Sequence, residues 1–340
     1  MQRLVGIDAA RGLAVLGMFA AHVGFAGSPG SAWLVAAQGR SAAVFALLAG
    51  VSMALMSGGR EPVTGEHARL ARLRIAIRAG AVGALGYFLV GLGTPIAVIL
   101  PSYAVMFLLT VPLLLLRPLI LVLAAGAFAV AGPALVAAAG GRAPGLGVDP
   151  LGLLLTGYYP AAVWMTYVLT GLAVGRVALR EPGTQTRLVV GGGALAIAGY
   201  GLGGLLTRLA PPDLAERFST EPHSGTTPEV LGNLGVALAV VGLLLAVAET
   251  RIGRIVLAPV AATGALALTV YTGQIVAIAV LGPAVVFEQT DNGTLIAFTV
   301  VTVAACTVWF RTLGRGPLER GLRALSAAAT TRATAGGGTR

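Results

Sequence analysis

Apolar runs of about twenty residues recur from one end of this 340-residue chain to the other. The hydrocarbon core of a bilayer is about 30 Å thick, and a helix crosses it with roughly 20 mostly apolar residues. Hydrophobic residues make up 56% of the sequence and charged residues only 11%, which is far too apolar for a soluble domain of this length. The sequence therefore predicts an all-α polytopic membrane protein.

Ten transmembrane helices are expected from these runs. They cover about residues 4–26, 40–57, 76–94, 98–116, 118–138, 160–178, 187–208, 229–248, 256–281 and 294–311. We expect one membrane domain over 1–325, followed at 326–340 by a low-complexity tail without structure. A cleaved signal peptide is the alternative for the first run, but Asp8 and Arg11 lie inside its apolar region.

Arginine supplies the whole positive charge of the chain, because the sequence contains no lysine and its net charge is +10. With a cytoplasmic N-terminus, only Arg40, Arg142, Arg208 and Arg217 lie outside, and the other 19 of 23 arginines lie inside. This asymmetry follows the positive-inside rule. It predicts cytoplasmic termini in a plasma (inner) membrane, with membrane lipids rather than nucleic acid as the partner of the basic residues.

The first predicted helix carries three ionisable residues, Asp8, Arg11 and His22. Such groups within a span cost a few kcal/mol, so each is a functional hypothesis. At 100° per residue, Arg11 and His22 differ by only about 20° in direction and by about 16 Å in height. Asp8 lies three residues before Arg11 and is expected to pair with it. The alternatives are a pair that anchors the helix end and a neutral imidazole bonded to a neighbouring helix.

Histidine titrates near neutrality and can act as a general base, so His22 is the first catalytic candidate, with Arg11 and Asp8. His223 is the second, in the outer segment EPHSGTTPE, where Glu221 could orient it. Further polar or aromatic residues could line a cavity together with these catalytic candidates, or could simply form hydrogen bonds between helices. They are Arg40, Tyr158, Tyr159, Trp164, Tyr167, Tyr271 and Gln274.

Several activities find no support in the sequence. It contains no HExxH motif, no Walker glycine loop and a single cysteine, Cys306. Metal-dependent hydrolysis, ATP-driven transport and a cysteine-based metal site therefore have no motif behind them, and we expect no metal.

The segment IDAARGLAVLGMFAAH, residues 7–22, resembles the first helix of the membrane acyltransferase superfamily. Its acyltransferase-3 branch has an arginine, ten residues and then a histidine, here Arg11 and His22. With GRSAAVFALLAGVSMAL at 39–55, the opening is more similar to bacterial relatives of heparan-alpha-glucosaminide N-acetyltransferase. Later similar pieces are GYYPAAVWMTYVLTGLAVGR at 157–176, PHSGTTPEVLG at 222–232, GALALTVYTGQ at 264–274 and GRGPLERGLR at 314–323.

One difference from that family concerns the histidine. In the lysosomal heparan-alpha-glucosaminide N-acetyltransferase, the histidine proposed to be catalytic lies in the first luminal loop. The corresponding residues 27–40 of this chain contain no histidine. If a histidine serves in this chain, it must be His22 or His223.

The resemblance implies transfer of an acyl group, acetyl in the first instance, from cytoplasmic acyl-CoA to a hydroxyl or amine of an envelope glycan or small-molecule acceptor. His22 would act as a general base or form a transient acyl-imidazole. Arginines after the second span could bind the phosphates of acyl-CoA, or could only reflect topology and anionic lipid. They are Arg69, Arg72, Arg74 and Arg78.

Two other classes of function stay open on the sequence alone. A transporter or translocator of a glycan, lipid or polar solute could use the same polar residues as its pathway, although we find no internal repeat of the kind such folds often show. A non-catalytic scaffold would leave the aligned Asp8, Arg11 and His22 unexplained. The oligomeric state is not predicted.

Overall fold

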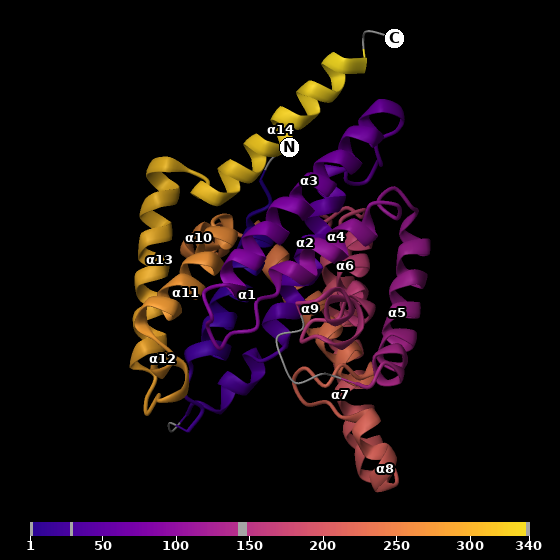
Figure 1. The fold of residues 1–340 in the computed structure, drawn as a ribbon, viewed down its shortest axis with the longest axis vertical. Helices are drawn as coiled ribbons and strands as arrows, with labels where there is room; N and C mark the ends of the chain where they lie inside the picture. Colours follow the sequence, from indigo (N-terminus) through magenta and orange to yellow (C-terminus); the bar gives the residue numbers. More distant parts are fainter. Residues whose placement is uncertain (1–2, 28–29, 142–147, 338–340) are drawn as a thin grey trace. The chain divides into compact units, whose positions relative to one another are not determined.

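The computed structural model describes residues 3–27, 30–141 and 148–337, and every regular element within these ranges is a helix (Figure 1). The all-α prediction is confirmed. By length and composition, seven described helices could cross a membrane. They are α1 (Val5–Val23), the run Ala32–Met56, which joins η1 (Ala32–Ala37) and α2 (Arg40–Met56), α3 (Gly65–Val90), α5 (Pro118–Ala138), α7 (Pro182–Leu209), α9 (Thr227–Glu249) and α13 (Gly293–Leu313).

The other three predicted spans are helical but not simple membrane crossings. α10 (Arg251–Ala265) and α11 (Ala267–Leu281) form one broken run, bent by 68°. α4 (Leu100–Thr110) has 11 residues and α6 (Ala161–Val174) has 14, too few for either to cross about 30 Å of hydrocarbon alone. The chain is thus polytopic, with seven candidate spans in its described part, or eight if the bent pair counts as one, rather than ten.

Short helices and a final long one complete the chain. They are η2 (Gly152–Thr156), α8 (Pro212–Ala215), η3 (Glu216–Phe218), α12 (Ala284–Phe287) and α14 (Pro317–Gly337). The tail expected to lack structure from residue 326 therefore differs from the helix found there. Residues 338–340 of that tail, and Arg142 of the charge count, lie outside the described residues.

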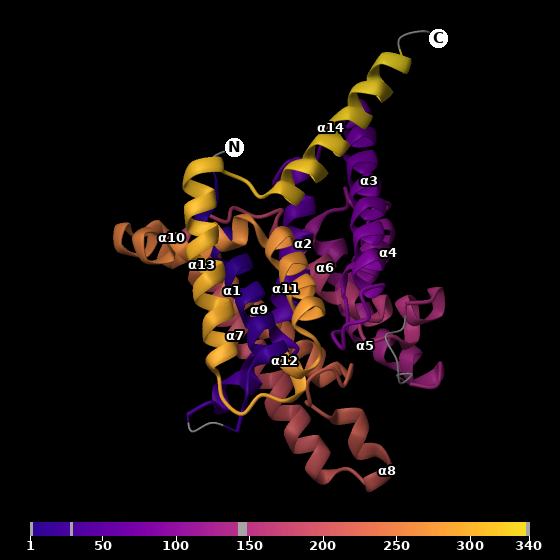
Figure 2. The same ribbon diagram turned by 60° about the vertical axis from the view of Figure 1, so that its left-hand side comes forward.

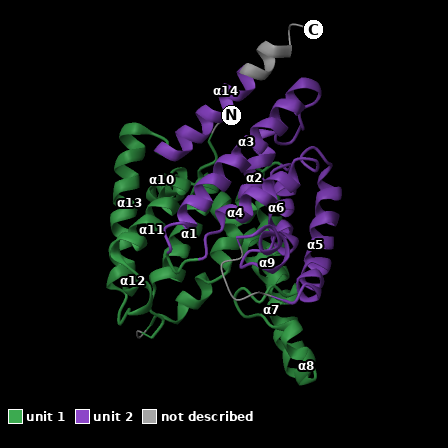
Figure 3. Cartoon of the chain, in the orientation of Figure 1, with its two compact units in different colours: residues 1–48, 94–96, 178–316 green, residues 49–93, 97–177, 317–340 purple. Residues whose placement is uncertain are grey.

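Two compact units divide the chain, and each is assembled from separate stretches (Figure 3). Unit 1 comprises residues 1–48, 94–96 and 178–316, and unit 2 comprises 49–93, 97–177 and 317–340. α2 contributes to both. The boundary between them matches no consecutive domain, and the single domain over 1–325 stays a prediction.

Unit 1 is built around α1, which packs against α9, α10 and α13 (Figure 2). Small residues allow α1 and α10 to approach at backbone distance. A Cβ atom on Gly12 would collide with the carbonyl of Val260, and one on Gly264 with the carbonyl of Asp8. The two helices are therefore antiparallel and in direct backbone contact. α7 and α9 form the other main pair of this unit.

Unit 2 pairs α5 with α6, α3 with α4 and α3 with α14. Arg176, just after α6, is 4% exposed. Its guanidinium donates to the carbonyls of Ala54, Ser57, Gly59 and Leu114 at 2.6–3.4 Å and to the Ser57 hydroxyl at 2.8 Å. These oxygens compensate the buried charge and hold the end of α6 to the residues that close α2.

Candidate active site

His22 lies in the last turn of α1, in unit 1, and faces the side chain of Gln274 on α11. Its Nδ1 atom is buried and has no hydrogen-bond partner among the described residues. Gln274 is 3% exposed, and neither polar atom of its amide has a partner there either. A buried polar group without a partner costs about 1–3 kcal/mol. This pair therefore has unused capacity to bond a substrate.

Asp8 occupies the opposite end of α1. Its carboxylate accepts from Arg11 Nη1 at 2.9 Å, which confirms the predicted ion pair, and from Arg3 Nε. The Arg3 guanidinium also lies 4.1 Å from the centre of the Phe310 ring. Asp8 thus pairs with two cations and anchors the start of the helix, so Asp8, Arg3 and Arg11 are already paired with one another.

The packing of α1 on α9 sets which residues share the level of His22. A Cβ on Gly6 would touch the backbone of Leu245, so the two helices cross there. A Cβ on Gly17 would touch the Ser41 side chain, and one on Gly39 would lie 3.5 Å from Glu229 Oε1, so the start of α9 lies toward the far end of α1 and the two helices are antiparallel. From that crossing, His22 lies about 24 Å along α1, and Glu229 lies the same distance back along α9. Glu229 therefore lies at about the same height in unit 1 as His22.

Glu229 is a buried carboxylate, 4% exposed, in the first turn of α9. It accepts from the backbone N–H groups of His223 and Gly225, each at 2.6 Å. The amide of Asn233 donates to it at 3.0 Å and the hydroxyl of Ser224 at 3.2 Å. We expected Glu221 to orient His223, but the bonds that hold its backbone come from Glu229.

His223 is the only described non-glycine residue with positive φ, at 62°. Left-handed backbone is unfavourable for most side chains and persists where surrounding bonds impose it. The bond from His223 N–H to Glu229 is such a constraint. The loop before α9 is therefore held in a fixed conformation rather than left free.

Arg40 joins the Glu229 network through the ring of Tyr200. Its guanidinium lies 4.7 Å from the centre of the Tyr200 ring, and its Nη1 donates to the carbonyl of Val35 at 3.1 Å. The Tyr200 hydroxyl bonds Asn233 Oδ1, and Asn233 bonds Glu229. Two sequence-predicted residues, Arg40 and His223, thus meet in one network.

Glu229, Asn233 and Tyr200 are the members of this network that the sequence analysis missed. Thr226 and Glu229 have the spacing of a helix-capping box, and Thr226 Oγ1 does accept from Glu229 N–H at 3.2 Å. That local pattern explains the acidic residue as a cap. Only the folded loop shows that its carboxylate also binds residues 223–225.

The predicted aromatic residues of unit 2 form a contiguous row. Ring centres are 5.0 Å apart for Tyr158–Tyr159, 4.9 Å for Tyr159–Trp164 and 5.1 Å for Trp164–Tyr167, all edge to face. Tyr158 is the exposed member at 38%, and the other three are buried. The four rings lie together, and their role as a substrate surface stays a prediction.

The four arginines predicted to bind the donor lie along the first half of α3, also in unit 2. Arg69, Arg72 and Arg74 are exposed, and Arg78 is half-buried. In unit 1, Tyr271 lies one turn before Gln274 on α11 and is 2% exposed. Within the described residues, no group of three or more His, Cys, Asp or Glu side chains could hold a metal ion.

Two sequence families match the chain. Residues 3–199 match the family described as heparan-alpha-glucosaminide N-acetyltransferase, catalytic, and residues 176–329 match a family described as a protein of unknown function (DUF418). The first match includes α1 with His22, and the second includes the Glu229 network from Tyr200 onward and Gln274. No curated protein matches the chain.

Proposed function

Because the chain belongs to the heparan-alpha-glucosaminide N-acetyltransferase catalytic family, we propose that it transfers an acyl group, acetyl in the first instance, from cytoplasmic acyl-CoA to an acceptor across the membrane. The acceptor is a hydroxyl or amine of an envelope glycan or a related small molecule. The observation that carries this proposal is the His22 imidazole, which faces the Gln274 side chain and whose buried Nδ1 has no partner among the described residues.

His22 acts as the general base. Its neutral imidazole takes the proton of the acceptor O–H or N–H while the acceptor oxygen or nitrogen attacks the thioester carbonyl carbon. The carbon–sulfur bond then breaks, and the departing thiolate of coenzyme A takes the proton from the imidazolium. The side-chain amide of Gln274, which the imidazole faces, is available to bond the acceptor beside it. If His22 instead forms an acyl-imidazole, the acyl label will remain on the protein when no acceptor is present.

The cluster of Arg40, His223 and Glu229 supports the acceptor end of the reaction. It shares the level of His22, and its buried network presents fixed polar groups, a feature of sites that bind polar ligands. We propose a plasma membrane as the location, and the positive-inside rule supports an orientation with this end on the outer face and both termini in the cytoplasm. The Asp8–Arg11 pair lies at the inner end, and the arginines of α3 remain the sequence-based candidates for the donor phosphates.

The test is acyl transfer by purified protein incubated with labelled acetyl-CoA and envelope extract. Replacing His22 with alanine should lower the transfer rate by about 10²–10⁴-fold, the usual contribution of a positioned general base. His67→Ala is the matched control, because His67 is exposed on α3 and should leave the rate unchanged. Undiminished transfer by folded His22→Ala protein would overturn the catalytic assignment.

One observation favours a second candidate, a transporter or translocator. Discontinuous helices often form the binding sites of transporters, and α10 and α11 are broken by 68° beside α1. Movement of an acceptor across vesicle membranes without acylation would support this function. If the acceptor becomes labelled only when labelled acetyl-CoA is supplied, and does not cross the membrane without acylation, transport is excluded as the main activity.

A further inference from the structure

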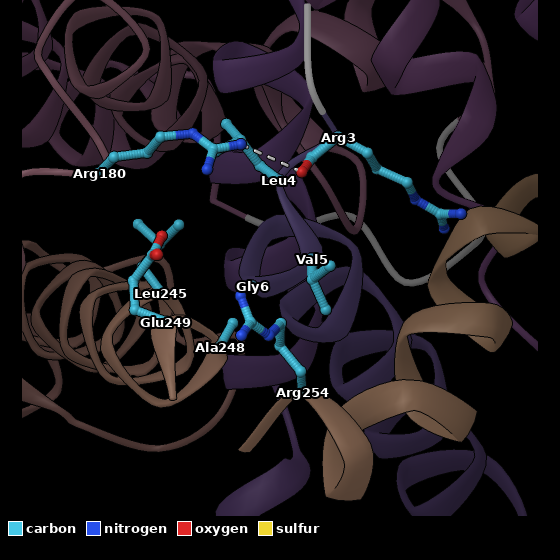
Figure 4. Close-up of a pocket in the computed structure, with 9 residues that line it drawn as sticks. All are labelled: Arg3, Leu4, Val5, Gly6, Arg180, Leu245, Ala248, Glu249 and Arg254. Carbon is cyan, nitrogen blue, oxygen red and sulfur yellow. Dashed lines mark hydrogen bonds between the residues drawn. The ribbon is translucent and has the colours of Figure 1, made fainter. Parts of the chain in front are cut away.

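A cavity of about 300 Å³ opens at the N-terminal end of α1, within unit 1 (Figure 4). It lies at the end of α1 opposite to His22, so it is separate from the candidate active site. Its apolar side is formed by Leu4, Leu245 and Ala248. Its polar side is formed by three arginines and one acid, namely Arg3, Arg180, Arg254 and Glu249.

The charges around this cavity are unbalanced. Two guanidinium groups, those of Arg180 and Arg254, face one carboxylate, and no described residue forms a salt bridge with Arg180, Arg254 or Glu249. Figure 4 shows the Arg3 guanidinium turned away from these three side chains. The side chain of Arg254 also has no hydrogen bond to any described residue, and Figure 4 shows its guanidinium turned toward Gly6 at the start of α1. An exposed cation in a concave site retains its capacity to bind an anion.

The other two arginines are held in place. Arg180 Nη2 donates to the carbonyl of Arg3 at 3.3 Å, and Figure 4 shows this bond across the rim of the cavity. Arg3 is fixed by Asp8 and by the ring of Phe310. The start of α1 has no side-chain cap, so its backbone N–H groups add positive potential on the same side. Held guanidinium groups bind phosphate with little loss of side-chain entropy.

We propose that this cavity binds a phosphate ester through Arg180 and Arg254. Guanidinium matches the geometry of phosphate oxygens and forms charge-assisted, often bidentate bonds with them. The chemistry is shared by two sources, the phosphates of coenzyme A and the headgroup of an anionic phospholipid. Only the first source rests on the proposed acyl transfer.

The experiment measures binding by the full-length protein, not turnover. Coenzyme A is titrated into protein in phosphatidylcholine nanodiscs, and thermal stability is compared between phosphatidylcholine and phosphatidylglycerol nanodiscs. Arg254→Gln and Arg180→Gln should each lower the affinity of the protein for the ligand that occupies the cavity by about tenfold or more, as expected for one lost charge-assisted bond. Arg251→Gln is the matched control, because Arg251 is exposed on the same helix but does not line the cavity.

A loss confined to coenzyme A supports the proposal with the donor as the source. A loss confined to phosphatidylglycerol stabilisation supports it with lipid as the source. If both variants bind both ligands as Arg251→Gln does, the cavity is not a phosphate site. The proposed acyl transfer fails separately, through an active His22→Ala variant, so the two outcomes are distinguishable.

Discussion

Two ionisable residues of unit 1, Glu229 and His22, differ in their hydrogen bonding. The buried carboxylate of Glu229 has several donors, whereas the buried Nδ1 atom of His22 has no partner among the described residues. Glu229 accepts from four donors, which include the backbone of two loop residues. Nδ1 of His22 accepts from none in the described structure. The first arrangement is that of a positioning residue, and the second is that of a group able to exchange a proton with a substrate.

Glu229→Gln tests the positioning role. In the variant, an NH₂ group replaces one of the two carboxylate oxygens that accept hydrogen bonds in the wild type. Because this group cannot accept from the loop's N–H donors, the loop at 223–225 should lose its fixed conformation. We expect about 1–3 kcal/mol less stability and a raised KM for the acceptor with kcat changed less. Thermal unfolding and acceptor titration measure the two effects.

The matched control for that variant is Glu221→Gln, in the same loop but exposed. It should leave both unfolding and acceptor KM unchanged. Equal effects of the two substitutions would show that loss of charge in the loop, and not the bonds of Glu229, determines the result.

At the scale of helices, the close crossing of α1 and α10 is what positions His22 relative to α11. Gly12 and Gly264 allow backbone contact between α1 and α10. The bend at Leu266 then turns α11 so that Gln274 meets α1. A change in the crossing should therefore alter the site from a distance of about 15 Å along α1.

Gly12→Ala tests this crossing. Its Cβ would meet the carbonyl of Val260, so the helices must separate, and we expect a loss of about 1–3 kcal/mol together with reduced acyl transfer. The control is Gly193→Ala on α7, where no atom lies within 4 Å of the new Cβ. A Gly12→Ala protein as stable and active as the control would contradict the role of this contact.

The sequence predicted where helices form but not how each one ends. Hydropathy located all ten runs because apolar composition alone determines partition into lipid. It could not detect that α4 stops at Thr110, two residues before Pro112, since the following residues are equally apolar. Nor could it detect the break at Leu266, which interrupts an apolar run with no change in composition.

At the scale of the whole molecule, the candidate site combines residues that are far apart in sequence. Local spacing was sufficient to predict the Asp8–Arg11 pair, because its members lie one turn apart on one helix. It was insufficient for the link from Arg40 through Tyr200 and Asn233 to Glu229, and for the cavity with Arg3, Arg180 and Arg254. Those sets exist only after the helices of unit 1 have packed.

In the proposed reaction, an acyl group crosses the membrane to an acceptor on the other side. The most direct measurement reconstitutes the full-length protein in sealed vesicles, with glucosamine trapped inside and labelled acetyl-CoA added outside. We expect labelled N-acetylglucosamine inside the vesicles, with almost none for His22→Ala. Release of unmodified glucosamine from the vesicles, with no label transferred to it, would rule out the proposed acyl transfer and favour transport.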